Sequence, residues 1–208
     1  MVFKSSEKYQ QRILKHYVAV WDDKFSVLKW DRGPITKLPS KFEVLEFPPT
    51  AERNTWIYAT CCMSQPIDQV KIELHMYSGV QDRALVELLT AVVYYHRLRH
   101  HLNLNHTVNF GKSWQGDSKC SYGFISLPYL EGPMLENLEI DEGEILKFYW
   151  LIPVTEQEVE YKTAFGVEAL ESKMEEGEFN YIDPYRLSVV LLNEKALLGV
   201  RLIIVFRG

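Results

Sequence analysis

One segment, residues 71–111, constrains the fold of this chain more than any other. Its first part alternates apolar and polar side chains, which predicts a β-strand with one apolar face: Ile72, Leu74 and Met76 alternate with Glu73, His75 and Tyr77. A helix is predicted next, from about Asp82 to about His101, and either Asp82 or a capping box of Ser78 and Gln81 can begin it. Because apolar residues lie on more than one side of this helix, we expect it to be buried.

The rest of the chain alternates less regularly between strands and helices. An amphipathic helix is expected over residues 5–21, and strands are expected over residues 42–47, 56–62, 124–127 and 145–154. Thr155 and Glu158 have the spacing of a capping box and predict a helix that runs toward Glu176, with a break at Gly166. This order lacks regular βαβ spacing, so it predicts an α+β fold in which a mixed sheet packs around the long central helix.

Composition limits the number of domains and the cellular compartments that we expect for this chain. No low-complexity stretch divides the 208 residues, so we expect a single compact domain over residues 1–208. No apolar run is long enough to cross a membrane, the N-terminus is too polar for a signal peptide, and three cysteines make no disulfide framework. A cytoplasmic protein is therefore predicted. The apolar tail, residues 191–208, fits either a final strand or a contact in a dimer.

The histidines are the first candidates for chemistry. His96 and His100 lie four residues apart on the predicted helix, a spacing that can hold zinc, and His75 and His106 flank the helix in sequence. The intervening residues include two arginines and no carboxylate, so we expect structural histidines and no metal. The sequence also lacks nucleotide-binding and serine-hydrolase motifs, which predicts no cofactor and no enzyme. The alternative is an enzyme or metal-binding protein that uses His75, His96 or His106 with a carboxylate or Cys120.

Charge separates the chain into two parts. Residues 131–183 hold fifteen Asp and Glu against three Lys, a net charge of −12, whereas the remaining residues carry +7. Such an acidic segment attracts a basic protein and repels nucleic acid, although it is also compatible with an ordinary solvated surface. The candidate contact residues, forming a predicted acidic face, are Glu139, Asp141, Glu142, Glu144, Glu175, Glu176 and Glu178.

A polar loop after the central helix offers a second candidate surface. His106, Asn109 and Trp114 supply polar and aromatic anchors there. The alternative is that Asn105 and Asn109 only hold a turn through hydrogen bonds to the backbone.

Several ordered blocks resemble one known family. The segments FEVLEFPP (42–49), WIYATCCMS (56–64), IELHMYS (72–78), NHTVNFG (105–111), SLPYL (126–130) and WLIPVT (150–155), with the helix of residues 85–96, are similar to the suppressor of fused-like domain. The resemblance covers about residues 33–190 and is of the short bacterial type; the tail does not match.

That resemblance implies an α+β domain that binds protein and does not catalyse a reaction. In bacteria the family is proposed to supply immunity proteins that neutralise polymorphic toxins, often nucleases. We therefore expect a protein partner, in particular a basic toxin domain, and no nucleic acid or membrane partner. A scaffold or regulatory binding domain is the alternative.

Overall fold

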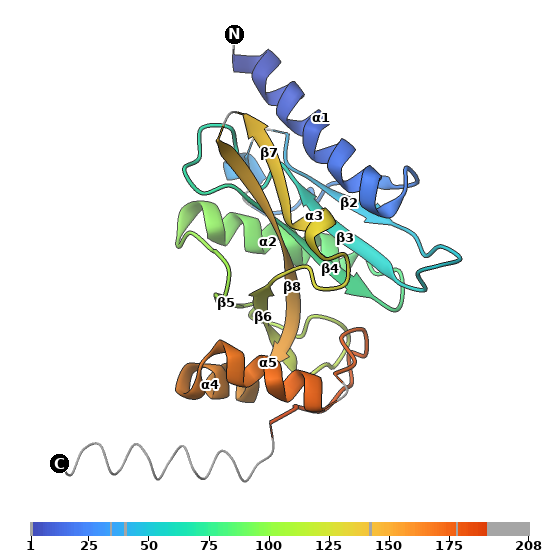
Figure 1. Ribbon diagram of the computed structural model, residues 1–208, viewed down its shortest axis with the longest axis vertical. Coiled ribbons are helices and arrows are strands. Elements are labelled where there is room, and N and C mark those ends of the chain that lie inside the picture. The colour runs from blue at the N-terminus through green and yellow to red at the C-terminus, as the bar shows by residue number, and fades with distance from the viewer. Residues whose placement is uncertain (1, 34, 40, 142, 178, 191–208) are drawn as a thin grey trace, which may run out of the picture. The chain divides into compact units, whose positions relative to one another are not determined.

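The computed structural model describes residues 2–190 apart from residues 34, 40, 142 and 178 (Figure 1). The chain forms two compact units, one from residues 1–106 and 125–152 and the other from residues 107–124 and 153–208. Strands and helices are mixed along the chain, which confirms the predicted α+β class. The apolar tail, predicted to be a strand or a dimer contact, lies outside the described residues.

The first unit is built on a mixed sheet. Its strands are β1 (Ser26–Leu28), β2 (Glu43–Phe47), β3 (Trp56–Cys61), β4 (Ile72–Ser78), β7 (Asn137–Asp141) and β8 (Glu144–Thr155), the last of which continues into the second unit. Strands β1 to β4 pair antiparallel in chain order, whereas β8 pairs parallel with β4 and antiparallel with β7. The predicted mixed sheet is thus confirmed.

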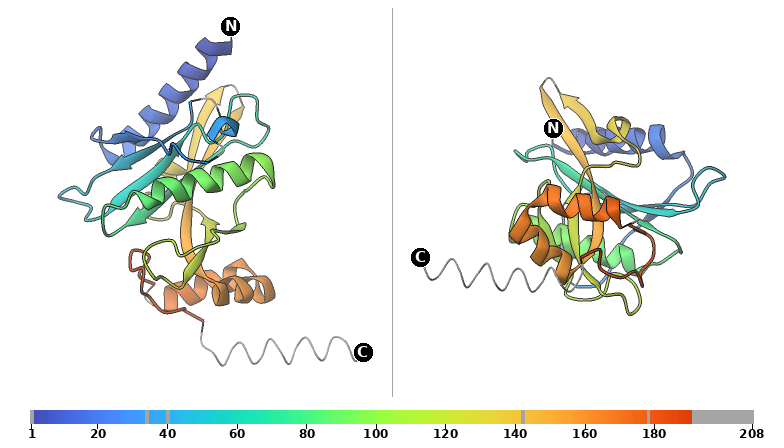
Figure 2. Two further views of the ribbon diagram at one scale, coloured as in Figure 1. Left: turned by 180° about the vertical axis from the view of Figure 1, so that it is seen from behind. Right: turned by 60° about the horizontal axis from the view of Figure 1, so that its bottom comes forward.

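Helices α1 (Val2–Trp21) and α2 (Ala84–Leu98) cover opposite faces of this sheet (Figure 2). Helix α1 buries Ile13, Tyr17 and Trp21, and the Tyr17 ring stacks on Trp21 with 4.9 Å between ring centroids. Two short helical turns, η1 (Ile35–Lys37) and α3 (Pro133–Glu136), complete the unit.

The central helix begins and ends inside its predicted limits. The Asp82 carboxylate accepts a 2.8 Å hydrogen bond from the backbone N–H of Ala84, so Asp82 helps to begin the helix, as one alternative predicted. The predicted capping box of Ser78 and Gln81 is wrong, because the helix begins only at Ala84. The Ser78 hydroxyl instead donates to the carbonyl of Val80. The helix ends at Leu98, since the chain then turns back and the N–H of Leu102 donates to the ring of His96 at 2.8 Å.

The second unit contains a two-stranded ladder and two helices. Strand β5 (Thr107–Asn109) pairs antiparallel with β6 (Cys120–Ser126), and β6 lies beside β8 in the strand order. Strand β6 begins four residues earlier than the predicted strand. Helices α4 (Glu156–Phe165) and α5 (Val167–Glu176) meet at Gly166, whose φ of 96° confirms the predicted break. The capping box of Thr155 and Glu158 is also confirmed.

Candidate functional site

The polar face of β4 is buried, although the sequence pattern indicated a strand with only one apolar face. All seven residues of β4 are inaccessible, including Glu73 and His75. Aromatic residues of α1 cover this face: the Trp21 ring lies 5.2 Å from the His75 ring, centroid to centroid. The alternating pattern of residues 72–77 does not indicate this covering, because a helix far away in the chain supplies it.

Glu73 is a buried carboxylate held by four donors. The Thr60 hydroxyl and the Met63 N–H donate to Oε2 at 2.6 and 3.1 Å, and the Ser64 N–H and hydroxyl donate to Oε1 at 3.3 and 3.4 Å. Burial nevertheless raises the pKa of Glu73 to about 7. The group can therefore take up a proton near neutral pH, but it has no access to a substrate.

His75 lies beside a second buried carboxylate, Glu131. The distance from His75 Nε2 to Glu131 Oε2 is 3.9 Å, and neither ring nitrogen has a hydrogen-bond partner among the described residues. Burial lowers the pKa of His75 to about 3 and raises the pKa of Glu131. The other oxygen of Glu131 accepts hydrogen bonds from the Trp21 indole at 2.9 Å and from the Tyr77 hydroxyl. These contacts fix the chain at Glu131 in the core.

The remaining candidates for catalysis or metal binding are not brought together. His96 is buried, its Nδ1 accepts the Leu102 N–H, and burial lowers its pKa to about 4. Cys120 is buried and its thiol pKa is raised by that burial, which disfavours the reactive thiolate. His106 is exposed. Within the described part of the chain, no three His, Cys, Asp or Glu side chains gather closely enough to hold a metal ion.

The predicted acidic residues fall into two groups, one in each unit. In the first unit, Glu139, Asp141 and Glu144 are exposed on the β7–β8 hairpin, and Glu142 lies outside the described residues. Positive groups accompany them: Lys71 Nζ lies 3.2 Å from Glu144, and the Arg12 guanidinium donates to the backbone carbonyl of Glu139 at 2.5 Å. The hairpin is therefore less negative than its sequence indicated.

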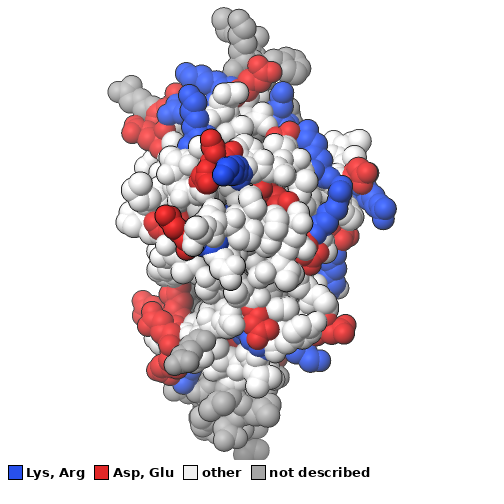
Figure 3. Space-filling model, turned by 90° about the vertical axis from the view of Figure 1, so that its right-hand side faces the viewer, with Lys and Arg blue, Asp and Glu red and all other residues white. Residues whose placement is uncertain are grey.

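The second unit carries the other acidic group, on helices α4 and α5. Glu175 and Glu176 are exposed at the end of α5, and Glu178 lies outside the described residues. Helices α4 and α5 expose three further glutamates, Glu156, Glu160 and Glu168. The two lysines of these helices, Lys162 and Lys173, are half-buried, and Lys173 Nζ lies 3.3 Å from Glu176. On the face drawn in Figure 3, both charge signs occur, so not every surface of the chain is acidic.

The predicted loop surface loses one of its three anchors. Trp114 is only 2% exposed and belongs to the core of the second unit. The Asn109 side chain accepts the N–H of Gly111 at 2.7 Å, which is the turn-holding role given as the alternative, although Asn109 itself stays exposed. His106 is exposed in the first unit.

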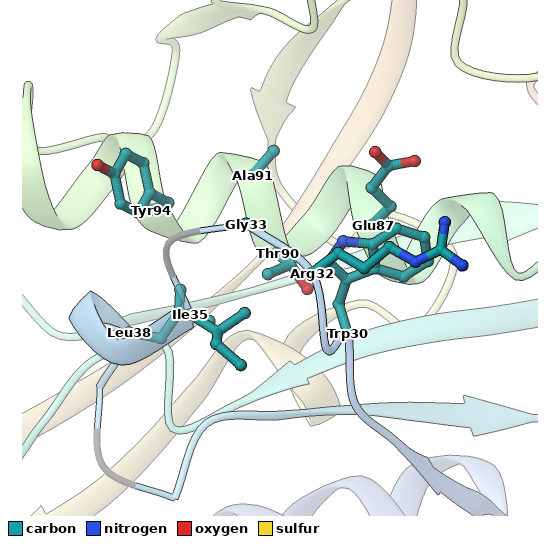
Figure 4. Close-up of a pocket in the computed structure, with 9 residues that line it drawn as sticks. All are labelled: Trp30, Arg32, Gly33, Ile35, Leu38, Glu87, Thr90, Ala91 and Tyr94. Atoms are coloured by element: carbon teal, nitrogen blue, oxygen red, sulfur yellow. The ribbon is translucent and has the colours of Figure 1, made fainter.

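A pocket of about 510 Å³ opens between α2 and residues 30–33 and 35–38 (Figure 4). Its floor is a stripe of α2 formed by Glu87, Ala91 and Tyr94. The sequence pattern did not indicate this pocket, because the helix was expected to be buried nearly all round. The charged Glu87 on the same stripe is the signal that could have indicated an uncovered side. A second pocket of about 510 Å³ lies beside the end of α1 and the Pro48–Glu52 turn.

None of the described helices is both long and apolar enough to cross a membrane.

Comparisons with known proteins agree on one family. The model of the suppressor of fused protein (SUFU) matches residues 39–187. A SUFU homologue from Neisseria gonorrhoeae FA 1090 has a similar structure, with a TM-score of 0.78 and 27% identity over 89% of this chain and 98% of the other. No curated protein sequence matches significantly.

Two more distant structures share the fold. The crystal structure of a Sufu–Fu complex gives a TM-score of 0.67 at 14% identity, over 91% of this chain and 96% of that one. Drosophila Suppressor of Fused gives 0.66 at 15% identity, over 93% of this chain but only 54% of its own length. The family match spans most of the chain and agrees in extent with the segments that resemble it. The chain therefore belongs to the suppressor of fused (SUFU) family.

Proposed function

We propose that this chain is a non-catalytic protein-binding module whose partner is a basic protein, and that it acts in the bacterial cytoplasm as an immunity protein against a toxin domain. The family includes a member solved in complex with Fu, so protein binding has a precedent on this fold. The observation that carries the proposal is the excess of glutamates over lysines on α4 and α5, several of them exposed.

The geometry of α5 concentrates negative charge on one side. Glu168, Glu171 and Glu175 follow the spacing i, i+3, i+7 and therefore share one side of the helix, while Leu170 and Met174 are buried on another. Glu156 and Glu160 are one turn apart on α4. A surface of this kind accelerates association with a basic protein, and the effect weakens as salt is added.

A nuclease toxin is the partner class that this charge fits best. Such an enzyme binds phosphates through Lys and Arg, and carboxylates of an inhibitor can occupy the same cations. Contact through the hairpin residues Glu139, Asp141, Glu142 and Glu144 belongs to the same proposal, but Lys71 and Arg12 offset part of their charge. Glu175, Glu176 and Glu178 stay in the proposal, and among the described residues Glu175 is the stronger candidate, because Lys173 Nζ lies 3.3 Å from Glu176.

The test is a pull-down of the tagged chain from its native cells, with elution by a salt gradient. We expect the chain to retain one stoichiometric basic protein, which elutes as the salt concentration rises. A variant with both Glu168→Lys and Glu175→Lys should no longer retain this protein. The matched control reverses two exposed acids of the first unit, Asp31→Lys and Glu52→Lys, and should keep the partner. A parallel Glu139→Lys, Asp141→Lys variant separates the hairpin from the helices. Absence of a partner at low salt, or its retention by every variant, would contradict the proposal.

The alternative functions have less support. A catalytic role for His75, His96 or His106 would require one of them to line a cavity, and neither described pocket contains any of the three. A scaffold role through a dimer of the tail concerns residues 191–208, which lie outside the described residues.

A further inference from the structure

We propose that the pocket between α2 and residues 30–33 and 35–38 binds a molecule with a single carboxylate attached to an apolar chain, either a small carboxylic acid or the C-terminus of a peptide. The pocket is independent of the acidic helices, so this inference goes beyond the proposed protein partner. Its volume of about 510 Å³ lies within the range of small-molecule sites.

The pocket has a polar end and an apolar end (Figure 4). Trp30, Arg32 and Glu87 gather at one end, and Ile35, Leu38 and Tyr94 lie at the other. Between the two ends, the small side chain of Ala91 leaves space for a ligand beside the helix. From Glu87 to Tyr94 the helix rises about 10 Å, enough for an apolar chain of several carbons or about three residues of extended peptide.

Hydrogen-bond donors dominate the polar end. The Arg32 guanidinium lies 5.9 Å from the centre of the Trp30 ring, and within the described chain neither Arg32 nor the Trp30 indole N–H has a hydrogen bond or an ion pair. The Thr90 hydroxyl already donates to the carbonyl of Val86 at 2.6 Å, so it adds no donor. A planar guanidinium with unused N–H groups is suited to a carboxylate, which it can bind through two parallel hydrogen bonds.

Glu87 limits the charge of the ligand. Its carboxylate lies at the same end (Figure 4), and Glu87 takes part in another interaction within the chain. Glu87 repels any anion at this end, and Arg32 supplies the one positive charge of the described lining, so a ligand with one carboxylate is favoured over a dicarboxylate or a phosphate. The apolar end then holds the rest of the molecule against Ile35, Leu38 and Tyr94.

The experiment follows backbone amide NMR signals of the full chain during titration. The probes are hexanoate and the peptide acetyl-Ala-Ala-Leu with a free C-terminus, and each is paired with its amide. We expect saturable shifts at Gly33, Thr90 and Ala91 with at least one of the acids and none with the amides. The acid that binds identifies the source of the carboxylate.

Two variants of equal charge decide the role of Arg32. Arg32→Gln should weaken binding by roughly tenfold or more, because a hydrogen bond to a charged group is lost. Arg83→Gln removes an exposed arginine at the start of the same helix that does not line the pocket, and should leave binding unchanged. Ala91→Phe, which fills the floor from an exposed position, should abolish binding.

Three results would overturn the proposal. These are the absence of saturable shifts with either acid, equal binding of the amides, and equal effects of Arg32→Gln and Arg83→Gln. If Ala91→Phe fails to fold, the two arginine variants still decide the question.

Discussion

Glu73 shows how a single buried side chain sets a pH dependence. Its folded-state pKa of about 7 exceeds the ordinary value of 4.5, so between these two pH values the folded protein holds a proton that the unfolded chain has lost. Its contribution to stability is therefore complete below pH 4.5 and is lost as the pH rises to about 7. At 1.36 kcal/mol per pKa unit, this loss amounts to about 3 kcal/mol.

The original chain should lose stability as the pH rises from 4.5 to 7, because Glu73 loses its proton. We therefore predict that Glu73→Gln, which cannot ionise, abolishes this part of the loss. The free energy of unfolding, measured with urea across this pH range, should fall less steeply in the variant than in the original chain. His75, with its pKa of about 3, acts in the opposite direction in both proteins, so only their difference reports on Glu73. The exposed Glu52→Gln variant is the control. Parallel pH profiles for Glu73→Gln and the original chain would show that burial does not shift this group.

No sequence pattern linked His75 with Glu131, because 56 positions separate them. Only the folded chain brings Nε2 and Oε2 to 3.9 Å and encloses both groups. At this scale, residue type predicted candidates for chemistry, whereas the tertiary structure places His75 and Glu131 in the core.

At the scale of elements, sequence motifs predicted correctly those features that a few neighbouring residues are enough to form. The capping box at Thr155 is an example, since the Thr155 hydroxyl accepts the Glu158 N–H at 3.3 Å and Glu158 accepts the Thr155 N–H at 2.8 Å. The sequence did not indicate that Glu158 also accepts two hydrogen bonds from Arg186, at 2.7 and 2.8 Å. This buried pair fastens the segment after α5 to α4.

Loss of the cap should weaken the second unit measurably. Thr155→Ala removes a buried hydroxyl at the start of α4, and we expect it to lower the free energy of unfolding by about 1 kcal/mol. Thr163→Ala makes the same chemical change at an exposed position of the same helix and should have a much smaller effect. Urea unfolding followed by circular dichroism compares the two. Equal losses would mean that the cap adds nothing beyond helix propensity.

At the scale of the whole molecule, the open question is whether the two compact units unfold together. The sequence predicts one domain over residues 1–208, and β8 passes through both units without interruption. We therefore expect a single cooperative transition.

The tryptophans allow this to be measured. Of the five, Trp114 lies in the second unit, and Trp21, Trp30, Trp56 and Trp150 lie in the first. In a chain labelled with 5-fluorotryptophan, fluorine NMR gives one signal for each, and Trp114→Phe assigns the Trp114 signal. All signals should lose native intensity at the same urea concentration. A separate midpoint for Trp114 would show two independently stable domains.

The sequence by itself determined the α+β class, the central helix, the break at Gly166 and the family, because each rests on local periodicity, a cap or ordered motifs. Only the tertiary structure decided which polar groups are buried and which surfaces are open. Helix α1 covers Glu73 and His75, Lys71 and Arg12 accompany the hairpin acids, and the Ala91 stripe of α2 lines a pocket. These outcomes depend on packing between segments far apart in the chain, and a pattern of neighbouring residues carries no information about that packing.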